Sequence, residues 1–188
     1  KGLDQVAAQV LMTKDTMTND ASRSNARNTF DELLKLGAVP VVNENDTVST
    51  SEIPYVDNFG DNDRLSAIVS ALIGADLLIL MSDIDGLYSK DPHKNPDARF
   101  IGLVEEITPE LIGMGGGSGS DVGTGGMAAK LAAARIATDS GSDMIICNAD
   151  DVNVIHELVN GEEKGTLFLA HPNRDFDLMD YINTKYEI

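Results

Sequence analysis

Two short apolar runs constrain the fold of this 188-residue chain more than any other feature of its sequence. They are LLILM at 77–81 and MIIC at 144–147, and in neither run do polar residues alternate with apolar ones. A strand with one face in water would show that alternation, so these runs are typical of strands in a sheet that helices cover on both faces. We expect the segment 76–83, DLLILMSD, to be a central strand of such a sheet.

Strand and helix patterns alternate along the rest of the chain. Strands are expected at 8–13, 38–46, 76–83, 143–147 and 165–170, and helices at 22–37, 61–75, just after Thr108-Pro109, from the glycine-rich stretch to Gly141, and at 152–160. Gly37 stands where a helix C-terminal cap is expected. The alternation predicts an α/β domain, a three-layer αβα sandwich with a mostly parallel central sheet. Residues 47–60, TVSTSEIPYVDNFG, have the pattern of a hairpin or flap.

Composition excludes several classes of protein. Acidic residues outnumber basic ones by 31 to 14, and the net charge of −17 repels nucleic acid and anionic membranes. No apolar stretch approaches the roughly 20 residues of a membrane span. The single cysteine, Cys147, allows neither a disulfide framework nor a CxxC motif, which indicates a reduced, cytoplasmic setting. Its place in MIIC predicts a buried strand residue.

The stretch GGGSGSDVGTGGMAAK at 115–130 has two interpretations. So many glycines are typical of a flexible linker, but the stretch runs directly into apolar residues at helical spacing. Backbone N–H groups free of side chains, a helix N-terminus and Lys130 would instead form a cradle for phosphate groups. Neither GxxxxGK[ST] nor GxGxxG occurs in the stretch, so it is not a standard P-loop or Rossmann loop. From composition alone, linker and cradle are equally open.

Polar clusters follow three of the expected strands: NEND at 43–46, SDIDG at 82–86 and NADD at 148–151. Ligands of open α/β sheets bind at the carboxyl ends of strands. SDIDG resembles the DxDG nucleophile motif of haloacid-dehalogenase-type phosphatases, but Leu87 stands where that family has Thr or Val, and the motif lies in the middle of the chain.

Carboxylates and asparagines also interleave in NEND and in GDND at 60–63. This combination suits a substrate that carries both an ammonium and a carboxylate group. For Asp61, capping the helix at 61–75 is as open a role as contact with a ligand.

Several ordered motifs together resemble the glutamate 5-kinases, a group within the amino acid kinase family. These motifs are AQVLMT, NARNTFDELLKLGAVPVVNENDTV, FGDNDRLSAIVSALIGADLLILMSDIDGLY, GTGGMAAKLAAARIA and GTLF. The resemblance implies that ATP, with Mg²⁺, phosphorylates the side-chain carboxylate of L-glutamate to glutamyl 5-phosphate, the first step of proline biosynthesis.

The resemblance covers residues 1–170, as the C-terminal major part of an amino acid kinase domain. We expect the N-terminal part of that domain, with its own glycine-rich segment and lysine, to be missing from these residues. Residues 171–188 form a C-terminal tail that the resemblance does not assign, and no PUA domain is seen.

Site residues follow from the resemblance by position. Asp46 and Asn62 would contact glutamate, with Asn43 and Asp61 lining the same pocket, while Asp63 would organise the catalytic lysines. ATP would be bound by Ser82, Asp83, Thr124, Gly125, Gly126, Met127 and Lys130, of which Lys130 is also catalytic. The resemblance assigns no metal-ligating residues. It favours the cradle over the linker for GTGGMAAK.

Other functions remain as alternatives. Acetylglutamate, aspartate, carbamate and uridylate kinases share the expected fold, and the paired NEND and FGDND motifs favour glutamate among their substrates. A non-catalytic amino-acid sensor is a different class. The absence of the family's first lysine from these residues would fit a sensor, whereas the presence of Lys130 and Asp63 argues against it. The resemblance also implies a homo-oligomer, dimer or tetramer, with proline as a feedback inhibitor.

Overall fold

Strands and helices alternate in the computed structural model, which describes residues 4–47, 61–114 and 125–183. The strands are β1 Ala7–Met12, β2 Val39–Glu44, β3 Leu77–Ser82, β4 Leu87–Tyr88, β5 Phe100–Ile101, β6 Leu103–Val104, β7 Asp143–Asn148 and β8 Thr166–Phe168. The helices are α1 Lys14–Thr18, α2 Asp20–Lys35, α3 Asn62–Ile73, α4 Pro109–Met114, α5 Gly125–Ser140, α6 Val154–Val159 and α7 Leu178–Asn183. The expected α/β class is confirmed.

The strands form three sheets. The largest has the order β3-β7-β8-β6, in which β3 is parallel to β7, β8 is antiparallel to β7, and β6 is parallel to β8. β1 pairs with β2 in parallel, and β4 pairs with β5 as an antiparallel hairpin. Parallel pairing predominates, as expected. The carboxyl ends of β3 and β7 are level, with Ser82 opposite Asn148.

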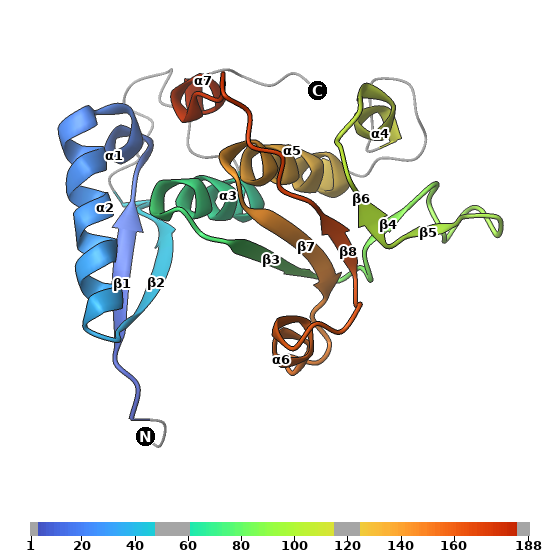
Figure 1. The fold of residues 1–188 in the computed structure, drawn as a ribbon, viewed down its shortest axis with the longest axis horizontal. Coiled ribbons are helices and arrows are strands. Elements are labelled where there is room, and N and C mark those ends of the chain that lie inside the picture. Colours follow the sequence, from blue (N-terminus) through green and yellow to red (C-terminus); the bar gives the residue numbers. More distant parts are fainter. Residues whose placement is uncertain (1–3, 48–60, 115–124, 184–188) are drawn as a thin grey trace.

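Helices cover both faces of the four-stranded sheet and complete the three layers (Figure 1). The core shared with α3 and α5 contains the strand residues Leu80, Met144, Ile146 and Phe168. The smaller core shared with α6 contains Ile145 and Cys147. Because successive strand residues point to opposite faces, one apolar run supplies both cores. Cys147 is buried, as expected.

β3 is an edge strand of its sheet, since within the described residues it pairs only with β7. The expectation that DLLILMSD is a central strand is therefore wrong. Its uniformly apolar sequence has another cause: Leu78 and Leu80 pack on the side of α3 and α5, while Leu77 and Ile79 pack on the side of α6. Burial of both faces does not require a neighbour on both edges. A cavity with walls from both strands separates β3 from β2.

The β1–β2 pair lies beside this sandwich, with α1 and α2 on one side of it (Figure 1). Met12, Met17 and Phe30 are each at most 1% exposed and belong to the same apolar cluster as the core under α3 and α5. Apolar packing thus continues from one sheet to the next and places the ends of β2 and α3 close to each other.

Helix ends follow the expected capping residues. Gly37 has a φ of +71°, the left-handed conformation of a helix C-terminus, and the Ala38 N–H donates to Leu33 O at 2.9 Å. The Asp61 carboxylate caps α3 by accepting the Arg64 N–H at 2.8 Å.

The structure contains one helix that the sequence did not predict, and one predicted element lies almost entirely outside the described residues. Helix α1 was not expected; a capping box formed by Thr13 and Thr16 begins it directly after β1. The hairpin or flap at 47–60 lies, apart from Thr47, outside the described residues. In the ranges that are described, none of the helices is long and apolar enough to cross a membrane.

Candidate active site

An ion pair joins Asp63, in the first turn of α3, to Lys130, in the second turn of α5. Lys130 Nζ lies 2.8 Å from Asp63 Oδ2, and the two side chains are 13% and 26% exposed. α3 and α5 run side by side above the four-stranded sheet, so residues 67 positions apart in the sequence meet here (Figure 1). A partly buried pair is screened less by solvent than a surface pair, and its carboxylate fixes the direction in which the ammonium group points.

The N-terminus of α5 begins inside the glycine-rich stretch. Gly125, Gly126 and Met127 form its first turn, and Met127 packs against the main core. A Cβ added to Gly126 would have no atom of the described residues within 4 Å. N–H groups of a first turn have no partner within the helix and point toward anions. Residues 125–130 are thus helical and not a linker, while Thr124 and the rest of the stretch lie outside the described residues.

A cavity of about 350 Å³ lies between β2, α3 and β3. Asn43 from β2 and Asn62 from α3 both line it, as does Ser66 one turn further along the helix. The structure therefore brings together two of the four residues expected to bind the substrate. Asp61 is engaged as the cap of α3, and Asp46 is exposed in the turn after β2, outside the lining of this cavity.

The clusters SDIDG and NADD meet at the ends of β3 and β7. Ser82 Oγ donates to Asp83 Oδ1 at 3.0 Å, and the Ala149 N–H donates to Ser82 O at 2.8 Å. The Asn148 side chain crosses between the clusters and donates to Asp85 Oδ1 at 2.9 Å. Asn148 is the first residue of the NADD cluster, whose place directly after the apolar run MIIC marked it as a candidate without predicting this contact. The Asp83 carboxylate stays exposed.

Within the described part of the chain, no three His, Cys, Asp or Glu side chains are grouped so that they could hold a metal ion. The candidate site has three parts: the Asp63–Lys130 pair, the cavity with Asn43 and Asn62, and the polar end of β3 with Ser82 and Asp83. Together they offer an ammonium group, amide groups and helix N–H groups, which suit anionic ligands.

The sequence of the chain matches one protein family and several known relatives. A profile described as "Amino acid kinase family" matches residues 2–148. Glutamate 5-kinase from Clostridium perfringens (strain 13 / Type A) is 52% identical over 165 residues, covering 88% of this chain and 61% of the relative. Glutamate 5-kinase from Listeria monocytogenes serotype 4a (strain HCC23) is 49% identical over 166 residues, covering 88% of this chain and 60% of the relative.

Solved structures agree on the fold. UMP kinase from Bacillus anthracis superposes with a TM-score of 0.59 at 16% identity, covering 90% of this chain and 60% of that one. Isopentenyl phosphate kinase from T. acidophilum gives a TM-score of 0.55 at 17% identity, covering 87% and 60%. At such identity the likeness concerns the fold alone. The chain spans about three fifths of the length of the relatives that it matches.

Proposed function

Since the chain belongs to the amino acid kinase family, we propose that it carries out ATP-dependent phosphorylation of the side-chain carboxylate of L-glutamate, giving glutamyl 5-phosphate, the first step of proline biosynthesis. The observation that carries the proposal is the ion pair between Asp63 and Lys130 at the start of α3 and α5. The two relatives named glutamate 5-kinase, at 52% and 49% identity, support the choice of substrate.

The chemistry needs positioning and charge neutralisation more than proton transfer. The glutamate side chain is already ionised near pH 7, so its carboxylate attacks the γ-phosphoryl group without a general base. Lys130 neutralises charge that builds up on the transferring group, and Asp63 holds the ammonium in place. The N–H groups of the first turn of α5 add donors for phosphate oxygens.

We assign L-glutamate to the cavity between β2, α3 and β3, and ATP to the end of β3 and the start of α5. L-Glutamate binds at the cavity that Asn43 and Asn62 line, whose amides can both donate and accept. Asp46, in the exposed turn after β2, and Asp61, the cap of α3, are the carboxylates assigned to the same substrate. ATP binds along Ser82 and Asp83 and the segment Thr124, Gly125, Gly126, Met127 and Lys130.

Mg²⁺ fits the oxygen donors at the nucleotide end. The exposed carboxylate of Asp83 is a ligand of the kind that Mg²⁺ takes beside phosphate oxygens and water. When bound, the ion neutralises phosphate charge. We further propose a cytoplasmic homo-oligomer in which proline is a feedback inhibitor.

Substrate choice is tested on the full-length protein, by ADP release from ATP and Mg²⁺ with L-glutamate, N-acetylglutamate or aspartate at equal concentration. We expect turnover with L-glutamate and little with the other two, because a pocket built on hydrogen bonds discriminates strongly among polar ligands. Equal turnover of N-acetylglutamate would refute the assignment.

Lys130→Ala tests the catalytic role within the same assay. We expect kcat to fall by roughly a hundredfold or more, because a preorganised charge in the transition state is lost. Lys164→Ala is the matched control, since Lys164 also pairs with a carboxylate, Glu157 Oε2 at 2.5 Å, but on the surface. Asp63→Asn should resemble Lys130→Ala, and Asp46→Ala should mainly raise the KM for glutamate. A folded Lys130→Ala protein with normal kcat would show that the site is wrongly assigned.

A further inference from the structure

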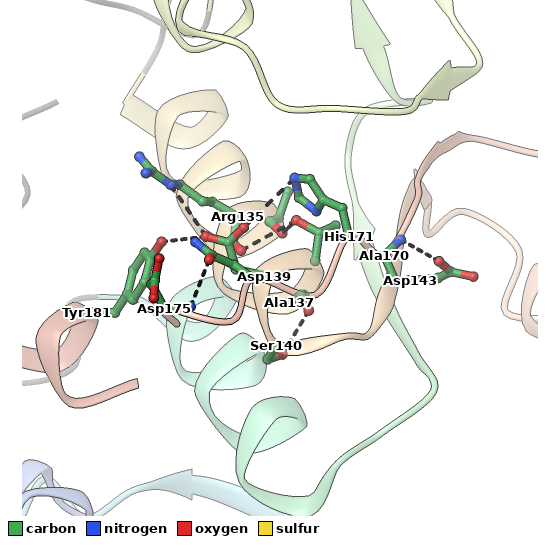
Figure 2. Close-up of polar contacts among 12 residues, drawn as sticks. Arg135, Ala137, Asp139, Ser140, Asp143, Ala170, His171, Asp175 and Tyr181 are labelled. Atoms are coloured by element: carbon green, nitrogen blue, oxygen red, sulfur yellow. Dashed lines mark hydrogen bonds and ion pairs between the residues drawn. The ribbon is translucent and has the colours of Figure 1, made fainter. Parts of the chain in front are cut away.

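Residues 170–183 lie beyond the part matched by the family profile and fold back over the C-terminal half of α5 (Figure 2). The N–H groups of His171 and Asn173 donate to the carbonyl oxygens of Thr138 and Asp139, each at 3.1 Å. The chain then enters α7, where Tyr181 is only 8% exposed. This segment is therefore packed as part of the core.

The hydroxyl of Tyr181 is bound to α5. It donates to Asp139 Oδ2 at 2.5 Å, and Asp139 is itself 8% exposed. Arg135 Nε lies 3.7 Å from the same oxygen, and the Arg135 guanidinium lies over the Tyr181 ring, 5.8 Å from its centroid. His171 Nε2 lies 3.9 Å from the other oxygen (Figure 2). A buried carboxylate surrounded in this way holds the hydroxyl at one position on α5.

The backbone carbonyl of Tyr181 is bound to α3. It accepts a hydrogen bond from Arg64 Nη2. Arg64 follows Asp63 directly in the first turn of α3, and its own N–H binds the capping carboxylate of Asp61 at 2.8 Å. A single residue thus links the two helices that carry the Asp63–Lys130 pair near their N-terminal ends.

We propose that Tyr181 is a positioning residue for phosphoryl transfer. Through its hydroxyl on Asp139 and its carbonyl on Arg64, it fixes how the first turn of α3 is set against α5, and thereby how Asp63 meets Lys130. The catalytic consequence rests on the proposed function. Displacements of about 1 Å at a catalytic group can lower a rate by about a hundredfold, so a link outside the site is enough to matter.

Tyr181→Phe tests the proposal because it removes the hydroxyl and keeps the ring. We expect kcat to fall about tenfold in folded protein while the KM for ATP changes less than about twofold, since Tyr181 binds Asp139 and Arg64, and neither is among the residues assigned to ATP. Tyr88→Phe is the matched control: Tyr88 packs edge-on against Phe100 in the β4–β5 hairpin, 5.3 Å between ring centroids. It should keep the parent kcat.

Amide hydrogen exchange supplies a readout that does not depend on activity. Tyr181→Phe should accelerate exchange at 62–66, and Tyr88→Phe should not. Failure of the parent protein to phosphorylate L-glutamate would refute the proposed function, whereas the exchange comparison would still decide whether Tyr181 holds α3.

Two results would overturn the inference. One is a Tyr181→Phe protein with the parent kcat and unchanged exchange at 62–66. The other is a protein that melts at a lower temperature but keeps the parent kcat while folded, which would assign Tyr181 a purely structural role. If Tyr181→Phe does not fold, Arg64→Lys tests the same link from the α3 side, because it keeps the charge and removes the planar guanidinium. The same loss of kcat is then expected, and the parent kcat would refute the link.

Discussion

Thr166→Val should destabilise the fold out of proportion to the one atom that it changes. The Thr166 hydroxyl accepts the Leu87 N–H at 2.7 Å and donates to Ile101 O at 2.6 Å. Thr166 is fully buried in β8 and Leu87 is 1% exposed. One hydroxyl therefore connects the four-stranded sheet to both strands of the β4–β5 hairpin.

The magnitude follows from what valine leaves behind. Valine has nearly the shape of threonine, so little cavity forms, but a buried N–H and a carbonyl each lose their partner. A net hydrogen bond contributes about 1 kcal/mol, and a buried group left unpaired costs about 1 to 3 kcal/mol. We therefore expect the free energy of unfolding to fall by about 2 to 4 kcal/mol. Thr166→Ser keeps the hydroxyl and should lose about 1 kcal/mol, for the buried methyl group.

Urea unfolding followed by circular dichroism measures the effect, with the slope m checked for constancy. Thr29→Val is the control: the Thr29 hydroxyl donates to Asn25 O at 2.8 Å, but on the exposed surface of α2, and its replacement should change stability by less than about 0.5 kcal/mol. If Thr166→Val also stays within about 0.5 kcal/mol of the parent at constant m, the hydroxyl does not join the hairpin to the sheet as described.

Two further predictions concern the same sheet. Gly165 has a φ of +75°, and a Cβ there would lie 2.2 Å from Ile146 O, whereas a Cβ at Gly161, with a φ of +88°, would meet no described atom within 4 Å. Gly165→Ala should therefore lower the free energy of unfolding by more than Gly161→Ala does. Equal urea midpoints for the two variants would contradict this. Burial raises the pKa of the Cys147 thiol, so the folded state keeps its proton at a pH where the unfolded state loses it. Stability should then fall as the pH rises above about 8.5, and less steeply in Cys147→Ala, while the native thiol should resist a thiol reagent until urea unfolds the protein; a native thiol that reacts at once would argue against its burial.

Local features of the fold were predictable because short segments encode them. Gly37 and Asp61 end and begin helices through bonds to residues three or four positions away, and the apolar runs report burial of both strand faces. The edge position of β3 was not predictable, since neighbours in a sheet come from distant segments.

The candidate site also combines residues that a local sequence pattern marks with residues that only the fold brings together. Asn43 and Asn62 stand out at the ends of a strand and a helix, but only the resemblance paired Asp63 with Lys130, which is 67 positions away. Tyr181 and Asp139 are separated by 42 positions, and no pattern in the tail marks the tyrosine as a link.

Within the described residues β3 is paired on one side only, and for this chain that has a consequence in handling. Its residues, LLILMS, contain no charge and no proline, which is the composition of aggregation-prone strands. A strand edge of this composition is a template on which a strand of another molecule can add. Asp76 and Asp83 flank the run as charged gatekeepers, and the net charge of −17 keeps copies apart. Salt screens that repulsion within about 10 Å at 0.1 M, so concentrated stocks should stay monodisperse longest at low ionic strength.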